Sequence, residues 1–184
     1  LMLSGETASG KYPLEAVKTM AAIAEQAEKD RNAMGEYEVP MNENCSQREF
    51  LAHAAIDATR KLGVAGIITD SLTGETVRHL AAFRGPNPIL AICYNEKTQR
   101  WLNLSFGVIA IHQKDKISPN YMFTAALRML RQKGYITLDD KIAYLSGSFG
   151  LGNPGGTTFL EINKVRQVFD KSYKFHLPNK ENDK

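Results

Sequence analysis

The chain has 184 residues, enough for one domain with a full hydrophobic core and barely enough for two. Its composition, with 43% apolar and 23% charged residues, is that of an ordinary globular protein, and a formal net charge of +3 is too small to indicate a nucleic-acid surface. The two cysteines, Cys45 and Cys93, lack metal-ligand spacing and no run of about 18 apolar residues exists, so we expect a cytoplasmic protein with no membrane contact.

Residues 1–31 are predicted to form one short strand and one helix. Residues 1–3 are apolar, which predicts a buried strand, and residues 4–10 form a turn-rich connector. Pro13 suits the first turn of a helix, which we expect to extend to about Arg31. Apolar residues at helical spacing form a stripe along it: Leu14, Val17, Ala21 and Ala24. One strand and one helix cannot form a core, so we expect their partners to lie upstream of residue 1 and the stripe to pack against a neighbouring chain.

Residues 32–45 lack a sustained period and contain Pro40 together with several asparagines, which predicts a linker. A regular pattern begins at residue 46. Ser46 and Glu49 fit a capping box at the start of a helix, and Gly63 fits its end. At the other end of the chain, the basic stretch over residues 171–174 is interpreted as a solvated end.

Short apolar runs alternating with helical segments indicate βαβ units after this first helix. The runs cover residues 64–69, 88–93, 108–111 and 141–146, and helices are expected over 76–83, 96–102 and 121–131. This alternation predicts a parallel sheet covered by helices on both faces. A fifth strand over 157–165 follows a loop too short for a parallel crossover, so we expect it to be antiparallel. The predicted fold of residues 46–184 is therefore a three-layer αβα domain with a mixed, mostly parallel five-stranded sheet.

The loop before the fifth strand imitates a dinucleotide-binding motif. Gly150, Gly152 and Gly155 satisfy G-x-G-x-x-G literally, but that fingerprint must open a helix whose N-terminus meets the pyrophosphate. Here a β-branched and aromatic run follows, and Pro154 lacks the N–H that would bind phosphate. Two interpretations remain open for this loop: a mobile connection between two strands, or a loop that closes over an anionic ligand.

A second phosphate candidate follows the first strand of the domain. Ser71, Thr73, Gly74 and Thr76 leave the carboxyl end of that strand and enter a helix, whose N-terminus offers free N–H groups and partial positive charge. The alternative is an ordinary helix start capped by Thr73, with Ser71 and Thr76 solvated. The four histidines are isolated in the sequence and are expected to be structural or solvated: His53, His79, His112 and His176.

Residues 2–17 resemble the last strand and following helix of the catalytic barrel of pyruvate kinases. Residues 71–76 resemble the hydroxyl-rich loop that holds a phosphate of the allosteric sugar phosphate in that family, and residues 146–158 resemble its effector loop. The resemblance implies an effector or phosphate site at Ser71, Thr73, Gly74, Thr76, Gly155, Gly156 and Thr157. It also implies that the wall of a catalytic barrel survives only at Ser4, Glu6 and Thr7, with no metal site in this chain.

The same resemblance implies a division of roles. The parent enzyme would transfer phosphate from phosphoenolpyruvate to ADP with Mg²⁺ and K⁺, while this chain would be the regulatory domain, inactive alone, that binds a sugar phosphate or nucleotide and helps to form a homotetramer. Glu75 departs from the family, in which many members carry Lys or Arg there, and this argues against fructose 1,6-bisphosphate as the effector. Two alternatives stay open: an oligomerisation scaffold that binds no effector, and a free-standing enzyme acting on a phosphosugar or nucleotide.

Overall fold

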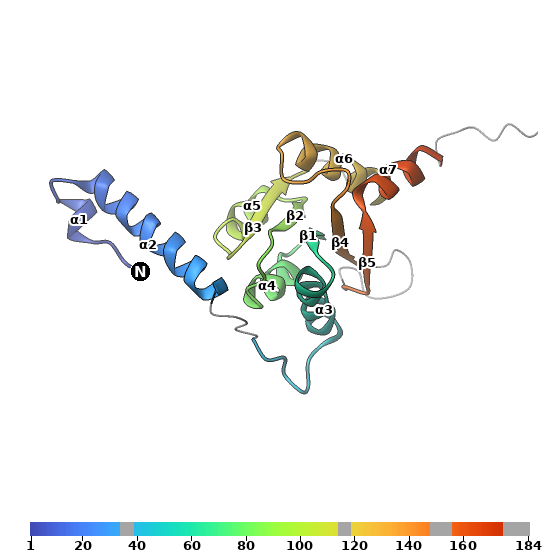
Figure 1. Cartoon of the computed structure of the whole chain (residues 1–184), viewed down its shortest axis with the longest axis horizontal. Helices are drawn as coiled ribbons and strands as arrows, with labels where there is room; N and C mark the ends of the chain where they lie inside the picture. Colours follow the sequence, from blue (N-terminus) through green and yellow to red (C-terminus); the bar gives the residue numbers. More distant parts are fainter. Residues whose placement is uncertain (34–38, 114–118, 148–155, 175–184) are drawn as a thin grey trace, which may run out of the picture. The chain divides into compact units, whose positions relative to one another are not determined.

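The computed structural model describes residues 1–33, 39–113, 119–147 and 156–174, and the chain divides into two compact units, Leu1–Glu38 and Val39–Lys184. Among its described residues, the smaller unit has the helices α1 (Gly5–Ala8) and α2 (Pro13–Ala33), both labelled in Figure 1. Among the described residues, no helix is long and apolar enough to cross a membrane.

The strand predicted at residues 1–3 does not form in the isolated chain. These residues have no regular structure, and Leu1 and Met2 are each 86% exposed. The reason is that a strand needs a hydrogen-bonding neighbour, and the described part of this unit contains none. The connector after it holds the short helix α1, in which the N–H of Ala8 donates to the carbonyl of Ser4 at 2.9 Å.

The helix predicted from Pro13 is confirmed as α2, and its apolar stripe is exposed within the single chain. Leu14 is 59% exposed and Val17 is 51% exposed. The stripe of this unit is therefore an unburied apolar surface in the isolated chain.

The larger unit contains one five-stranded sheet with the order β3-β2-β1-β4-β5. The first four strands are parallel and β5 runs antiparallel to β4, which confirms the predicted mixed sheet. The strand bounds are β1 (Val64–Ser71), β2 (Ile89–Cys93), β3 (Val108–His112), β4 (Lys141–Ser146) and β5 (Phe159–Lys164).

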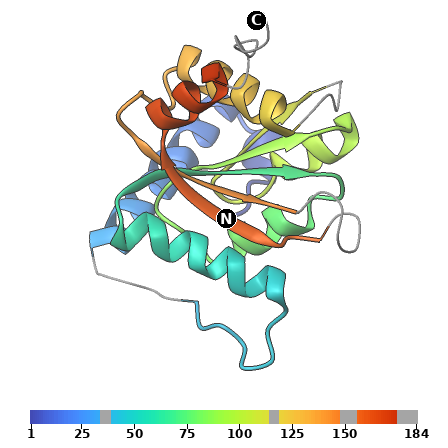
Figure 2. The same cartoon turned by 90° about the vertical axis from the view of Figure 1, so that its right-hand side faces the viewer.

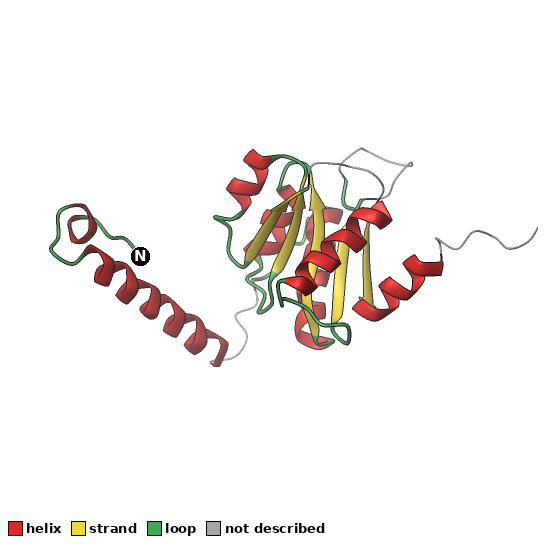
Figure 3. Cartoon of the chain, turned by 90° about the horizontal axis from the view of Figure 1, so that it is seen from above, coloured by secondary structure: helices red, strands yellow, loops and turns green. Residues whose placement is uncertain are grey.

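Helices cover both faces of this sheet, as Figures 1 and 3 show. One face carries α3 (Gln47–Lys61), α4 (Glu75–Ala82) and α5 (Glu96–Leu102), and the other carries α6 (Pro119–Gln132) and α7 (Val165–Lys174). In Figure 2 the red α7 and gold α6 lie on the opposite side of the sheet from α3 and α4.

Neighbouring residues of β1 supply the two cores. Ile67 packs with α3 and α4, Ile68 packs with α6, and both are completely buried, because successive strand residues point to opposite faces. The start of α3 is capped as the sequence predicts, with the Ser46 hydroxyl accepting the N–H of Glu49 at 3.2 Å.

Helix α7 was not predicted, and the interpretation of residues 171–174 as a solvated end missed it. Its first residue, Val165, is completely buried, and Val168 and Phe169 pack against the same core. The signal was present as an apolar spacing of three and four residues, but a strand over 157–165 already included Val165.

Candidate functional site

The carboxyl edge of the sheet has its topological switch point between β1 and β4. From β1 the chain proceeds outward through β2 to β3, and it then returns to place β4 on the other side of β1. In open α/β sheets, ligands bind outside the carboxyl ends of the strands at such a point. Both candidate phosphate segments, residues 71–76 and 146–158, leave the sheet there.

Ser71 and Gly74 shape the turn that enters α4. The Ser71 hydroxyl accepts the N–H of Gly74 at 2.8 Å, and Gly74 has a φ of 82°, a left-handed conformation that favours glycine. Gly74, and not Thr73, is the N-cap residue, and no side chain caps the helix. Ser71 and Thr76 are each only 7% exposed. The alternative of a Thr73-capped helix with solvated hydroxyls is therefore wrong, while Thr73 itself is exposed.

A hydroxyl pair joins the two candidate segments. The Oγ1 atoms of Thr76 and Thr157 lie 2.7 Å apart, and Thr157 is 6% exposed. Thr157 is held by its neighbours, because the N–H of Thr158 donates to the carbonyl of Ser146 at 2.9 Å. The structure thus brings together two residues that lie 81 positions apart in the sequence. Gly155, the remaining predicted glycine of this loop, lies outside the described residues.

The two glycines at the base of the loop touch each other. A Cβ atom added to Gly147 would lie 2.2 Å from the carbonyl oxygen of Gly156, so the backbones approach more closely than any larger residue allows. This contact and the bond between Thr158 and Ser146 close the base of the loop.

Glu75, the predicted departure from the family, has a cation beside it. Its carboxylate forms an ion pair with Arg48, which projects from the first turn of α3. The Glu75 side chain is 49% exposed and that of Arg48 is 24% exposed, so the pair is screened by solvent. Arg48 therefore offsets part of the negative charge that Glu75 places at the start of α4, and sequence reasoning did not identify this partner.

Asp70 anchors a polar cluster that sequence reasoning also missed. Its two carboxylate oxygens accept hydrogen bonds from the hydroxyl of Ser146 and, at 3.5 Å, from that of Tyr94. Burial, followed by the charge of Asp70, raises the pKa of Tyr94 and raises that of Tyr144 to about 12. A carboxylate directly after a run of apolar strand residues was the available signal, because such a position is at the carboxyl edge of the sheet.

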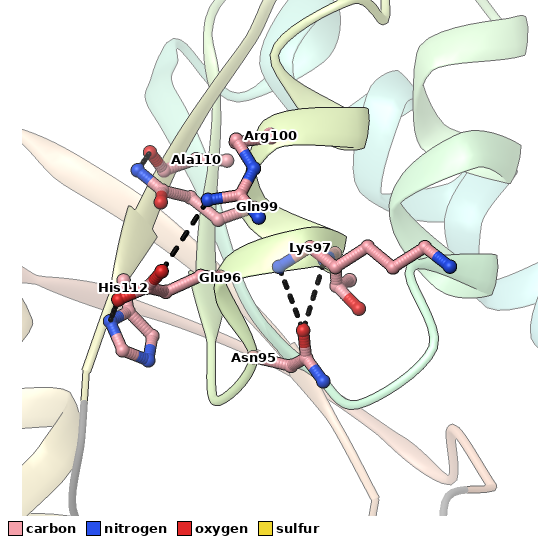
Figure 4. Close-up of polar contacts among 8 residues, drawn as sticks. Asn95, Glu96, Lys97, Gln99, Arg100, Ala110 and His112 are labelled. Atoms are coloured by element: carbon pink, nitrogen blue, oxygen red, sulfur yellow. Dashed lines mark hydrogen bonds and ion pairs between the residues drawn. The ribbon is translucent and has the colours of Figure 1, made fainter.

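Next to this cluster, α5 begins beside the end of β3, as Figure 4 shows. Asn95 caps the helix by accepting the N–H of Lys97 at 2.7 Å, and Glu96 pairs with Arg100 at 3.4 Å. His112 Nδ1 lies 3.9 Å from Glu96, too far for a hydrogen bond. Across the described ranges, no group of three or more His, Cys, Asp or Glu residues could hold a metal ion.

Ser4, Glu6 and Thr7, the predicted remnants of a barrel wall, bond among themselves. The Glu6 carboxylate accepts the N–H of Ser4 at 3.0 Å, and the Thr7 hydroxyl donates to the Ser4 carbonyl at 3.2 Å. Hydrogen bonds from the backbone N–H groups of Glu6 and Ser4 lower the pKa of Glu6.

The fold and its switch point define the class of doubly wound α/β domains. Within that class, residues 49–163 match the family "Pyruvate kinase, alpha/beta domain", and the chain belongs to the pyruvate kinase family. This finding confirms the family that the resemblance indicated.

Curated relatives agree with this assignment. The chain is 36% identical over 170 residues to the pyruvate kinase of Borreliella burgdorferi, covering 91% of this chain and 35% of that protein. It is 32% identical over 176 residues to the pyruvate kinase of Bacillus licheniformis, covering 93% and 29%. The chain thus spans about a third of the length of the curated relatives it matches.

Solved structures share the fold. A crystal structure of a Cryptosporidium parvum pyruvate kinase aligns with a TM-score of 0.74 at 24% identity, covering 89% of this chain and 32% of that one. A second structure of the pyruvate kinase from that organism, in complex with ADP, aligns with a TM-score of 0.70 at 22% identity, covering 89% and 33%.

Proposed function

We propose that this chain is the effector-binding and tetramer-forming domain of a pyruvate kinase, an enzyme that transfers phosphate from phosphoenolpyruvate to ADP to give pyruvate and ATP. Family membership supports the parent activity, since the relatives from Borreliella burgdorferi and Bacillus licheniformis are both pyruvate kinases. The chain alone is expected to be inactive. Ser4, Glu6 and Thr7 would contribute only one part of the active-site wall in the parent.

The contact between Thr76 and Thr157 carries the effector proposal. Two buried hydroxyls from separate segments face each other at the switch point, beside the N-terminus of α4. A phosphate group accepts hydrogen bonds from both hydroxyls and from backbone N–H groups, so it can replace their mutual bond without leaving either unsatisfied. Ser71, Thr73, Gly74, Gly155 and Gly156 are proposed to complete the site.

The charge near the site bears on the class of effector. Arg48 offsets only part of the negative charge of Glu75, which stands directly before Thr76 at the start of α4. A ligand with a single phosphate, such as a sugar monophosphate or a nucleotide, is therefore favoured over fructose 1,6-bisphosphate.

Magnesium and potassium are proposed for the parent enzyme only.

A thermal-shift screen with sugar mono- and bisphosphates, AMP, ATP and inorganic phosphate tests the effector proposal. A ligand that binds only the folded chain raises Tm by mass action. We expect a rise with one phosphate ligand that Thr76→Ala and Thr157→Ala both abolish and that Glu75→Gln increases. Thr137→Ala is the matched control, since Thr137 is exposed beyond the opposite end of β4.

A chain that responds to none of these ligands, in the fragment or in the full-length parent, would support the alternative of an oligomerisation scaffold. Sedimentation equilibrium of the full-length parent tests the tetramer, and a monomer at micromolar concentration would contradict it.

A further inference from the structure

Asp70 lies near the end of β1, beside the end of β4, where the two segments of the candidate site leave the sheet. Its side chain, however, is on the face of the sheet opposite to the hydroxyl pair. Its side chain lies on the α6 face, as does that of Ile68 two residues earlier, whereas Ser71 faces the α4 side. The hydroxyl pair of Thr76 and Thr157 belongs to the α4 side. Asp70 can therefore act on the candidate site only through the backbone of the strands, which links side chains on the two faces.

Ser146 provides that connection. It is the last residue of β4 and is 3% exposed. Its hydroxyl donates to Asp70 on the α6 side, and its carbonyl accepts the N–H of Thr158 at 2.9 Å. Thr158 directly follows Thr157, so Ser146 donates to Asp70 through its side chain and holds the end of the loop segment through its carbonyl.

These contacts form a closed ring around the switch point. The Asp70 carboxylate accepts from Ser146, whose carbonyl accepts from Thr158, the residue next to Thr157. The Thr157 hydroxyl bonds to that of Thr76 in α4. Ser71, the residue next to Asp70, closes the ring by accepting the N–H of Gly74 at the start of α4. The ring joins the ends of β1 and β4 to the starts of β5 and α4. Because each contact restrains the next, loss of one contact is expected to loosen its neighbours.

We propose that Asp70 is a positioning residue of the candidate effector site, which sets the place of Thr157 relative to Thr76 by holding Ser146. The identity of the site rests on the proposed function. The positioning itself is a property of the ligand-free chain and is measurable without any ligand.

A carboxylate suits this task because it accepts from two hydroxyls at once. Hydrogen bonds to an ionised acceptor are roughly twice as strong as those between neutral groups. The Tyr94 phenol is protonated at neutral pH, as that of any tyrosine with an ordinary or raised pKa is, so it donates to Asp70. Asparagine at position 70 would keep one oxygen for Ser146, whereas valine would remove the acceptor and still suit a strand.

Amide hydrogen exchange of the 184-residue chain, read residue by residue by NMR, tests the positioning. We expect Asp70→Val and Ser146→Ala to speed exchange of the Thr158 amide about tenfold more than that of the amides in the middle of β1. Asp70→Asn should restore most of the protection. Ile68→Val is the matched control, because it weakens the core on the same face and strand without touching the ring.

The proposal is overturned if Asp70→Val speeds the exchange of all amides in proportion, as Ile68→Val does. If Asp70→Val does not fold, the exchange rates of Ser146→Ala decide in the same way. A second arm titrates inorganic phosphate and the phosphate ligand found by thermal shift. We expect about tenfold weaker binding to Asp70→Val and near wild-type binding to Asp70→Asn. If neither probe binds any form of the chain, the effector function fails, while the exchange data still decide whether Asp70 positions Thr157.

Discussion

Tyr144 makes the stability of the domain depend on pH at the alkaline end. Burial, followed by the charge of Asp70, raises the pKa of Tyr144 from the ordinary value of 10.0 to about 12. The folded chain then binds more protons than the unfolded chain between these values, so the contribution of Tyr144 to stability is fully present below about pH 10 and is lost as pH rises toward 12. A shift of this size corresponds to about 2–3 kcal/mol.

Urea unfolding followed by circular dichroism between pH 8 and 11.5 measures this loss. We expect Tyr144→Phe to remove part of the decline, whereas Tyr135→Phe, at a site that is 45% exposed, should leave the profile unchanged. Tyr94 and Cys93 add slopes of the same sign, because their pKa values are also raised, that of Cys93 to about 11. Identical profiles for wild type and Tyr144→Phe would contradict the assignment.

Gly147 closes the base of the loop by its lack of a side chain. A Cβ there would meet the backbone oxygen of Gly156 at 2.2 Å, and backbone atoms cannot rotate away as a side chain can. Gly147→Ala should therefore destabilise the domain by about 1–3 kcal/mol in denaturant unfolding. Gly5→Ala is the control, since nothing lies within 4 Å of its added Cβ and no change beyond about 0.5 kcal/mol is expected. Equal effects of the two substitutions on the free energy of unfolding would mean that the backbones of Gly147 and Gly156 can separate without loss of stability.

At the scale of elements, α7 packs against the α6 face of the sheet through a few apolar side chains. Val165 is completely buried, and its truncation to alanine should cost about 2 kcal/mol. Arg166, the next residue, pairs with Asp139 at 3.0 Å between largely exposed side chains, so Arg166→Ala should cost less than about 0.5 kcal/mol. Urea unfolding of both variants checks the difference. A Val165→Ala cost as small as that of Arg166→Ala would show that α7 is dispensable to the core.

The elements that could be predicted are those whose pattern is local. The strands and the helices α3 to α6 follow from apolar periodicity and caps such as Ser46, and β5 from the short loop before it. Helix α7 was not predicted, because Val165 fits the end of a strand as well as the start of a helix. Residues 1–3 form no strand in the isolated chain, because an apolar stretch forms a strand only when a neighbouring strand is present.

The candidate site was predictable only in its parts. Ser71, Gly74 and Thr76 follow from the position of a hydroxyl-rich turn after a strand, and Thr157 from the resemblance. Their contact depends on strand order, which places β4 beside β1 and is not encoded in any local pattern. Asp70 and Arg48 were missed for the same reason, since each acquires its role from a partner distant in sequence.

At the scale of the whole molecule, the exposed stripe of α2 predicts self-association of the isolated chain. Leu14 and Val17 lie one turn apart on one side of the helix and are more than half exposed. Contiguous apolar surface of this kind favours association, because burial against a partner is worth about 25 cal/mol per Å².

Sedimentation equilibrium of the 184-residue chain at micromolar concentrations tests this. We expect the double variant Leu14→Glu with Val17→Glu to shift the population toward the monomer by at least about tenfold in the association constant, since each charge would have to be desolvated in the contact. Thr19→Glu, at an exposed position on another side of the same helix, should have little effect. An unchanged association constant in the double variant would show that α2 takes no part, and would assign any oligomer of the isolated chain to the larger unit, Val39–Lys184.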